Sequence, residues 1–113
     1  MPSLFTKIIN REIPAKIIYE TDKVLAFEDI HPQAPHHYLM VPKIEVPTLN
    51  DLTPENVSIV GELFLAAKEI AKQKGVDEKG YRVVMNCNHD GGQSVFHIHL
   101  HFLAGREMKW PPG

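Results

Sequence analysis

The chain has 113 residues, 43% of them apolar, and its 12 basic and 14 acidic side chains give a formal charge of −2. This composition predicts one folded domain over residues 1–113 and excludes a largely disordered chain. The sequence has no long basic run and no apolar run of about 20 residues, which argues against a nucleic-acid polymer as partner and against a membrane-spanning segment. A lone cysteine, Cys87, excludes an intrachain disulfide and favours a cytoplasmic location.

The N-terminal part is predicted to hold one short helix and three strands. Ser3 is a candidate N-cap for a helix from about Leu4 to Arg11, which Pro14 ends. Short apolar runs bounded by turn residues or prolines predict strands at 16–20, 24–28 and 37–42. The segment 29–35 carries two prolines, so we expect an ordered loop between the second and third strands.

The longest helix is predicted in the middle of the chain, after a loop at 47–51 with a short helical turn. Thr53 suits the N-cap, Pro54 suits the first helical position, and Gly75 suits the residue after the end. Apolar residues at spacings of three or four predict its buried face, namely Val57, Val60, Phe64, Ala67 and Ala71. We expect this helix to cover the sheet.

Two more strands are predicted at 81–87 and 97–103, joined by a functional loop at 88–94. The tail 105–113 ends in Trp110-Pro111-Pro112 and cannot continue a strand. One long and one short helix with a five-stranded antiparallel sheet predict an α+β fold.

The seven histidines fall into two groups. Polar and apolar residues alternate strictly over 97–103, so a strand there would point three imidazoles from one face, those of His97, His99 and His101. His89 lies just upstream, and His31, His36 and His37 form the second group, with no histidine between positions 38 and 88. If the two groups meet in space, they make one imidazole-rich site.

Four interpretations of the 97–103 run remain open from the residues alone. The histidines could be structural, could bind zinc, could act as general acid and base, or could include a nucleophile. Strand geometry puts the outer two Cα atoms about 13 Å apart. A zinc site would therefore be less strained with two of these histidines and His37 or His89.

A nucleophilic role fits chemistry on phosphorus. A neutral imidazole attacks phosphorus well, and a second histidine can protonate a departing amine near neutral pH. Backbone N–H groups of Gly91-Gly92-Gln93 and the Ser94 hydroxyl could hold phosphate oxygens. Cys87, at a strand end, is the weaker candidate nucleophile, and Ser94 lacks a nucleophile-elbow pattern and is predicted to be a donor.

The run 97–103 matches in full the His-φ-His-φ-His-φ-φ motif, where φ is apolar, and resembles the histidine triad (HIT) superfamily. The loop from Asp29 to His37, the lead-in Gly91–Ser94 and the ending Trp110–Gly113 resemble its branch of histidine triad nucleotide-binding proteins. The resemblance covers nearly the whole chain and implies a HIT-like fold.

The resemblance implies a purine nucleoside phosphoramidase that acts on adenosine 5′-phosphoramidates and aminoacyl-adenylates through a covalent nucleotidyl-histidine. It implies a purine nucleoside monophosphate-type substrate, no required cofactor with zinc as the alternative, and a homodimer. Strand 81–87 or the long helix would contact the second copy, with the tail 105–113 at the interface. The alternatives are a nucleotide-binding regulatory or scaffold protein with incidental hydrolysis and a dinucleoside polyphosphate hydrolase.

The motif also implies a role for each site residue. His99 matches the nucleophile, His101 the residue at the phosphate and leaving group, and His97 and His37 the supporting residues, with Ser94 as a catalytic donor. Asp29 matches the acceptor of ribose hydroxyls. The nucleotide-binding set is Phe27, Asp29, Ile30, Asn86, Gln93, Ser94, His99 and His101, with Phe5 and Leu39 nearby. Departures from the family pattern at His31, His36, Phe96 and Lys109 touch no catalytic position and leave the leaving-group preference open.

Overall fold

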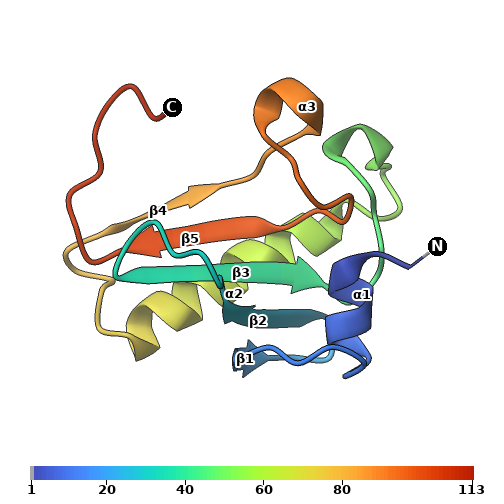
Figure 1. The fold of residues 1–113 in the computed structure, drawn as a ribbon, viewed down its shortest axis with the longest axis horizontal. Helices are drawn as coiled ribbons and strands as arrows, with labels where there is room; N and C mark the ends of the chain where they lie inside the picture. The colour runs from blue at the N-terminus through green and yellow to red at the C-terminus, as the bar shows by residue number, and fades with distance from the viewer. Residues whose placement is uncertain (1) are drawn as a thin grey trace.

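The computed structural model describes residues 2–113 and is built on a five-stranded antiparallel sheet (Figure 1). The spatial order of the strands is β1-β2-β3-β5-β4. Their bounds are β1 Ile17–Glu20, β2 Val24–Glu28, β3 His36–Pro42, β4 Tyr81–Val84 and β5 Leu100–Ala104. This order confirms the predicted α+β fold with five strands, and it makes β3 and β5 neighbours.

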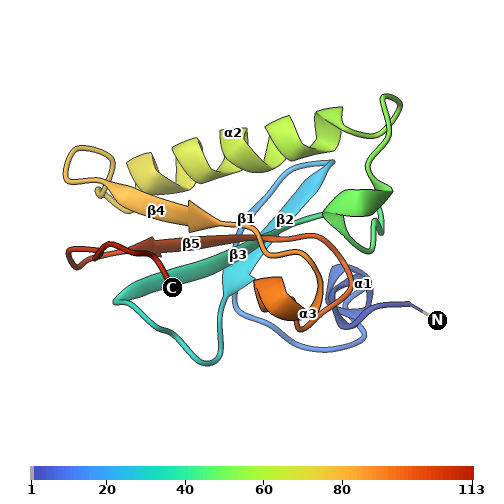
Figure 2. The same cartoon turned by 90° about the horizontal axis from the view of Figure 1, so that it is seen from above.

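Helices cover both faces of the sheet (Figure 2). The long helix α2, Ser58–Gln73, lies on one face, while α1, Leu4–Ile9, and α3, Asn88–Gly91, lie on the other. The short helical turn expected near residue 50 is η1, Leu49–Asp51. The prediction of two helices missed α3, because the loop sequence there shows no apolar periodicity over its four residues.

Alternating side chains of the strands divide into two cores. Residues on one face pack against α2 and include Val24, Ala26, Tyr38, Met40, Leu100 and Phe102. Residues on the other face pack against α1 and include Leu25, Phe27, Leu39 and Val41 with Phe5 and Ile8. His37 and His101, in register with these positions, therefore lie on the α1 face of β3 and β5.

The start of α1 is as predicted and its end is earlier. The Ser3 side chain accepts a hydrogen bond from the Thr6 N–H, which confirms the N-cap. The helix ends at Ile9, before the predicted Arg11, because Arg11 takes a left-handed conformation with φ of 62°.

The predicted start of α2 is wrong, and its predicted buried face is confirmed at Ala67 and Ala71 but wrong at Val57 and Phe64. Thr53 is not its N-cap, because the Asn56 side chain accepts from the Thr53 N–H and holds this segment in a turn before the helix begins at Ser58. Val57 and Phe64 are 48% and 49% exposed. The residues buried together with Ala67 and Ala71 are Ile59, Leu63, Ala66 and Ile70.

The last two strands differ from their predicted bounds. β4 stops at Val84, and β5 begins at Leu100, so His97 and His99 precede the strand. The reason is the neighbouring strand: β3 ends at Pro42, and the Ile98 N–H donates to the Val46 carbonyl outside the sheet. Among residues 2–113, no helix combines the length and apolar character needed to cross a membrane.

Candidate active site

The two histidine groups meet on the α1 face of the sheet. β3 and β5 pair with Leu39 opposite His101 and His37 opposite Leu103, and the His37 Nε2 lies 2.9 Å from the His101 Nδ1. The rings of His99 and His101 lie 5.0 Å apart between centroids. The structure thus brings His37, His97, His99 and His101 into one chain of contacts.

The remaining histidines lie apart from this group. His36 contacts the Tyr38 hydroxyl at 2.6 Å, on a side chain that packs in the α2 core. His31 and His89 are exposed, and among residues 2–113 the His89 ring has one hydrogen-bond partner, the neighbouring Asp90. His89 therefore cannot complete the zinc site that the sequence left open.

The hydrogen bonding of His99 leaves one ring nitrogen free. Its Nδ1 lies 2.8 Å from the His97 carbonyl oxygen, which can only accept, so the Nδ1 carries the proton. The Nε2 then holds a lone pair and has no hydrogen-bond partner among residues 2–113. The Phe5 ring packs edge-on against the imidazole at 4.9 Å. Burial lowers the pKa of His99, which keeps the ring neutral and nucleophilic near pH 7.

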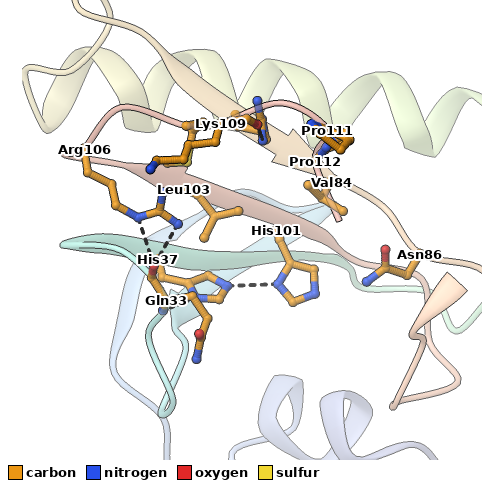
Figure 3. A pocket seen from close by; sticks show the side chains of 12 residues that line it. Gln33, His37, Val84, Asn86, His101, Leu103, Arg106, Lys109, Pro111 and Pro112 are labelled. Atoms are coloured by element: carbon orange, nitrogen blue, oxygen red, sulfur yellow. Dashed lines mark hydrogen bonds between the residues drawn. The ribbon is translucent and has the colours of Figure 1, made fainter.

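His37 and His101 form a pair with a defined proton arrangement (Figure 3). The Gln33 N–H donates to the His37 Nδ1 at 3.0 Å, so the proton of the neutral His37 ring sits on Nε2. That Nε2 donates to the His101 Nδ1, which leaves the His101 Nε2–H as a donor directed away from His37. Sequence reasoning missed Gln33, because a backbone N–H carries no residue-type signal.

Burial keeps this pair neutral, and neighbouring imidazoles reinforce the effect at His101. The pKa of His101 is lowered to about 4, mainly by burial and then by electrostatic repulsion from His99 and His37. The Asp29 carboxylate acts in the opposite direction and raises this pKa. Burial also lowers the pKa of His37, against the Asp29 carboxylate whose Oδ2 lies 3.4 Å from the His37 Nε2. Without a bound anion, both imidazoles are uncharged at neutral pH.

His97 is a buried support for His99. Its Nε2 donates to the Pro42 carbonyl at 2.8 Å, and its Nδ1 accepts from the Ser3 hydroxyl at 2.7 Å. Glu45 holds this end of α1 through the Ser3 N–H and the Thr6 hydroxyl, at 2.8 and 2.6 Å. Burial lowers the pKa of His97. The contact of Ser3 with His97 and the role of Glu45 were not predicted, because no short-range pattern links Ser3 to a histidine 94 positions away.

The loop after β2 contributes Asp29 and an apolar wall. The Asp29 Oδ1 accepts from the His31 N–H at 2.8 Å, and its Oδ2 faces His37. Phe27 is buried against Phe5, with ring centroids 5.5 Å apart. Ile30 is 85% exposed and reaches solvent from the same loop.

Of the two predicted site residues in the loop before the histidines, Gln93 is buried and Ser94 is exposed. The Gln93 side chain is buried, where it accepts from the Asn88 N–H and donates to the Pro47 and Val95 carbonyls. Its amide is thus used within the loop. Ser94 is exposed, and its hydroxyl has no hydrogen-bond partner among residues 2–113.

A pocket of about 450 Å³ adjoins the imidazole pair (Figure 3). This volume suits a small-molecule ligand. The residues that line it are Gln33, His37, Arg82, Val84, Asn86, His101, Leu103, Arg106, Met108, Lys109, Pro111 and Pro112. Of the predicted nucleotide-binding set, it includes Asn86 and His101. The cations Arg82 and Arg106 were missed, because isolated charges in a strand and a tail are common on ordinary surfaces.

Asp29, His37 and His101 also form the one metal-like cluster among the described residues, with ligand atoms within 4.8 Å of one another. A metal on the His37 Nε2 would force its proton onto Nδ1. The His37 Nδ1 lies 3.0 Å from the Gln33 backbone nitrogen, so two N–H donors would then face each other with no acceptor between them. The residues present therefore do not fit a metal at this position.

Comparison with known families matches residues 10–108 to the HIT domain. The chain belongs to the HIT family. It is 50% identical over 106 residues to the purine nucleoside phosphoramidase of Escherichia coli K12, and the alignment covers 94% of this chain and 89% of that protein. It is also 50% identical to the 14 kDa zinc-binding protein of Zea mays, covering 99% and 88% of the two chains. The crystal structure of a HIT family hydrolase from Legionella pneumophila superposes with a TM-score of 0.96 at 47% identity, covering 99% and 100%.

Proposed function

We propose that this chain is a purine nucleoside phosphoramidase. It hydrolyses the P–N bond of adenosine 5′-phosphoramidates, and also acts on aminoacyl-adenylates, through a covalent nucleotidyl-histidine. The observation that carries the proposal is the His99 ring, whose Nδ1–H binds the His97 carbonyl and whose Nε2 lone pair is free. The identity to the E. coli phosphoramidase supports the substrate class.

In the first step, the His99 Nε2 attacks the α-phosphorus in line. An N–P bond forms, the P–N bond to the amine breaks, and the electron pair leaves on the amine nitrogen. Positive charge develops on the His99 ring, where the His97 carbonyl stabilises it through the Nδ1–H. The His101 Nε2–H then faces the phosphate and the departing nitrogen.

His101 supplies acidity only when substrate is bound. In the free protein its pKa of about 4 keeps it neutral. A bound phosphate brings negative charge beside the ring, and an opposite charge raises the pKa of an imidazole. The departing amine takes its proton from His101. In the second step, water attacks the phosphorus, its proton passes to His101, and the bond between the phosphorus and the His99 Nε2 breaks, which releases the nucleotide.

The nucleoside lies on the side of Asp29, with the carboxylate accepting from ribose hydroxyls and Phe27 and Ile30 beside the base. The neighbouring apolar rings of the α1 core support this placement. Ser94 holds phosphate oxygens from the loop before His97, a role that its exposed hydroxyl supports. Asn86 contacts the sugar–phosphate region, and its position in the pocket beside His101 supports this role.

The reaction requires no cofactor. This proposal rests on the proton arrangement of His37, which opposes a metal at the cluster of Asp29, His37 and His101. Metal analysis of the purified protein should find substoichiometric zinc, and a chelator should leave the rate unchanged. Stoichiometric zinc and loss of activity on chelation would contradict it.

The protein acts as a homodimer in which α2 and β4 contact a second copy. β4 is an edge strand with unpaired backbone groups, which need cover. α2 exposes Phe64 and Leu65, its N-cap residue Val57 is also exposed, and β4 exposes Tyr81. Such an apolar face on a small protein marks an interface. A single domain over 1–113, a tail 105–113 at the interface and a cytoplasmic location stay predictions from the sequence.

Substitution of the nucleophile tests the function. The His99→Ala variant should lose turnover of an adenosine 5′-phosphoramidate by about a thousandfold or more. AMP binding, followed by calorimetry, should change little, because the Asp29 loop is intact. The matched control is His89→Ala, which removes an exposed imidazole outside the site. Full activity of His99→Ala would contradict the assignment, and a wild-type protein that binds AMP without turnover would favour the regulatory alternative.

A further inference from the structure

Three cationic side chains line the pocket beside the imidazole pair: Arg82, Arg106 and Lys109. The Arg106 guanidinium donates twice to the Gln33 carbonyl, at 3.1 and 3.2 Å, and Arg82 donates to the Lys109 carbonyl at 3.0 Å. These acceptors are neutral. Among residues 2–113, no carboxylate lies within 4.0 Å of any of the three charges, and no acidic residue lines the pocket. No ion pair among the described residues therefore neutralises the positive charge of this wall.

The register of the sheet fixes how far this charge lies from the reacting centre. On β4 and β5, Arg82 is opposite Leu103, and Val84 is opposite His101. Two residues along a strand span about 7 Å. Leu103 and Val84 thus form an apolar floor between His101 and the cations, and Figure 3 shows Arg106, Lys109 and the imidazole pair around Leu103.

The pocket adjoins the residues assigned to the phosphate and is not lined by those assigned to the base. Its lining includes His37, His101 and Asn86, but neither Asp29 nor Phe27. In an in-line displacement, the leaving group departs on the side opposite the attacking His99. A leaving amine would then extend from His101 across the apolar floor toward the cations.

We propose that this pocket is a leaving-group subsite that selects amines carrying an anionic group, a carboxylate or a phosphate, two or three carbons from the nitrogen. The inference rests on the proposed phosphoramidase function. The short apolar spacer matches the floor of Leu103 and Val84, and the terminal anion meets Lys109, Arg106 and Arg82. Lys109 is the most direct contributor, because its ammonium has no hydrogen-bond or ion-pair partner among the described residues.

Four probes test the subsite, each AMP joined through nitrogen to a different amine. The amines are β-alanine, which ends in a carboxylate, 2-aminoethyl phosphate, β-alanine amide, which is neutral, and 1,2-diaminoethane, which is cationic. The variants are Lys109→Gln, Lys109→Glu and Lys109→Arg, with Lys68→Gln as control. Lys68 is exposed on α2, on the opposite face of the sheet. Because each amine has its own basicity, the measured quantity is the ratio of kcat/KM between variant and wild type for each probe.

Lys109→Gln should lower this ratio for the two anionic probes by about 1.5- to fivefold relative to the neutral probe, the range for an exposed charge pair. Lys109→Glu should lower it further and raise the ratio for the cationic probe, while Lys109→Arg should restore the anionic preference. The effect should shrink in about 1 M salt, where the screening length is about 3 Å. The size of this decrease in kcat/KM, compared between the β-alanine and 2-aminoethyl phosphate probes, shows which anion the pocket prefers.

Every probe carries the same α-phosphate, so a cation that serves only this phosphate changes all four rates by one factor. A uniform change in the Lys109 variants, or a change equal to that of Lys68→Gln, would overturn the subsite and leave the phosphoramidase function standing. Absence of turnover for all four probes with wild-type protein would instead overturn the proposed function itself.

Discussion

The low pKa of His101 links the stability of the fold to pH. Burial, reinforced by His99 and His37, lowers this pKa from 6.5 to about 4. The folded state therefore binds fewer protons than the unfolded state between these two values, and it loses stability as the pH falls through them. At about 1.36 kcal/mol per pH unit, His101 alone removes about 3 kcal/mol of the free energy of unfolding across this window.

Urea denaturation at about pH 7.5 and about pH 4.5 measures this loss. At about pH 4.5, the His101 contribution amounts to about 2.5 kcal/mol. The His101→Gln variant cannot titrate there, and its amide oxygen can still accept from the His37 Nε2–H. The stability difference between the two pH values should therefore be smaller in His101→Gln than in the wild type by about 2.5 kcal/mol.

His89→Gln is the matched control, since the His89 side chain is fully exposed. The wild type should also lose stability through other buried histidines whose pKa values are lowered, and both variants retain these. If His101→Gln and His89→Gln showed the same difference between the two pH values, His101 would not be the buried, neutral imidazole described above. A larger acid loss in His101→Gln would refute the reasoning outright.

Three further results are expected. Because burial lowers the pKa of His99 below 6.5, the loss of kcat/KM for a phosphoramidate on the acid side should have its midpoint below pH 6.5; an acid-side midpoint above pH 7 would contradict this. Ser3→Ala removes both the N-cap of α1 and the donor to His97, and should cost about 1–2 kcal/mol in urea denaturation; unchanged stability would show that neither bond contributes. Phe64→Glu places a charge on the exposed apolar face of α2 and should shift a dimer toward monomer in sedimentation equilibrium; an intact dimer would move the interface elsewhere.

The histidine pattern alone predicted much of the site. Strict alternation placed His99 and His101 on one face, and the second group on a neighbouring strand brought His37 to them. The proton positions could not be predicted, because they depend on two backbone groups, the Gln33 N–H and the His97 carbonyl. Which groups face a ring is a property of the fold, and a sequence pattern does not contain it.

The α2 error has a different physical cause. The helix carries apolar residues on two faces, one with Ile59 and Leu63 and the other with Val57 and Phe64. Periodicity identifies an apolar face but does not say which one meets the sheet. The contact between Ser3 and His97 likewise joins distant parts of the chain and leaves no local signal.

The most direct test of the account is capture of the covalent intermediate. The wild-type protein is mixed rapidly with an adenosine 5′-phosphoramidate, denatured without acid during turnover, digested and examined by mass spectrometry. We predict one added nucleotidyl group on the peptide that carries His99, located on that residue by fragmentation. Substrate turnover with no adduct at His99, or with the nucleotidyl group on His101 instead, would contradict the account.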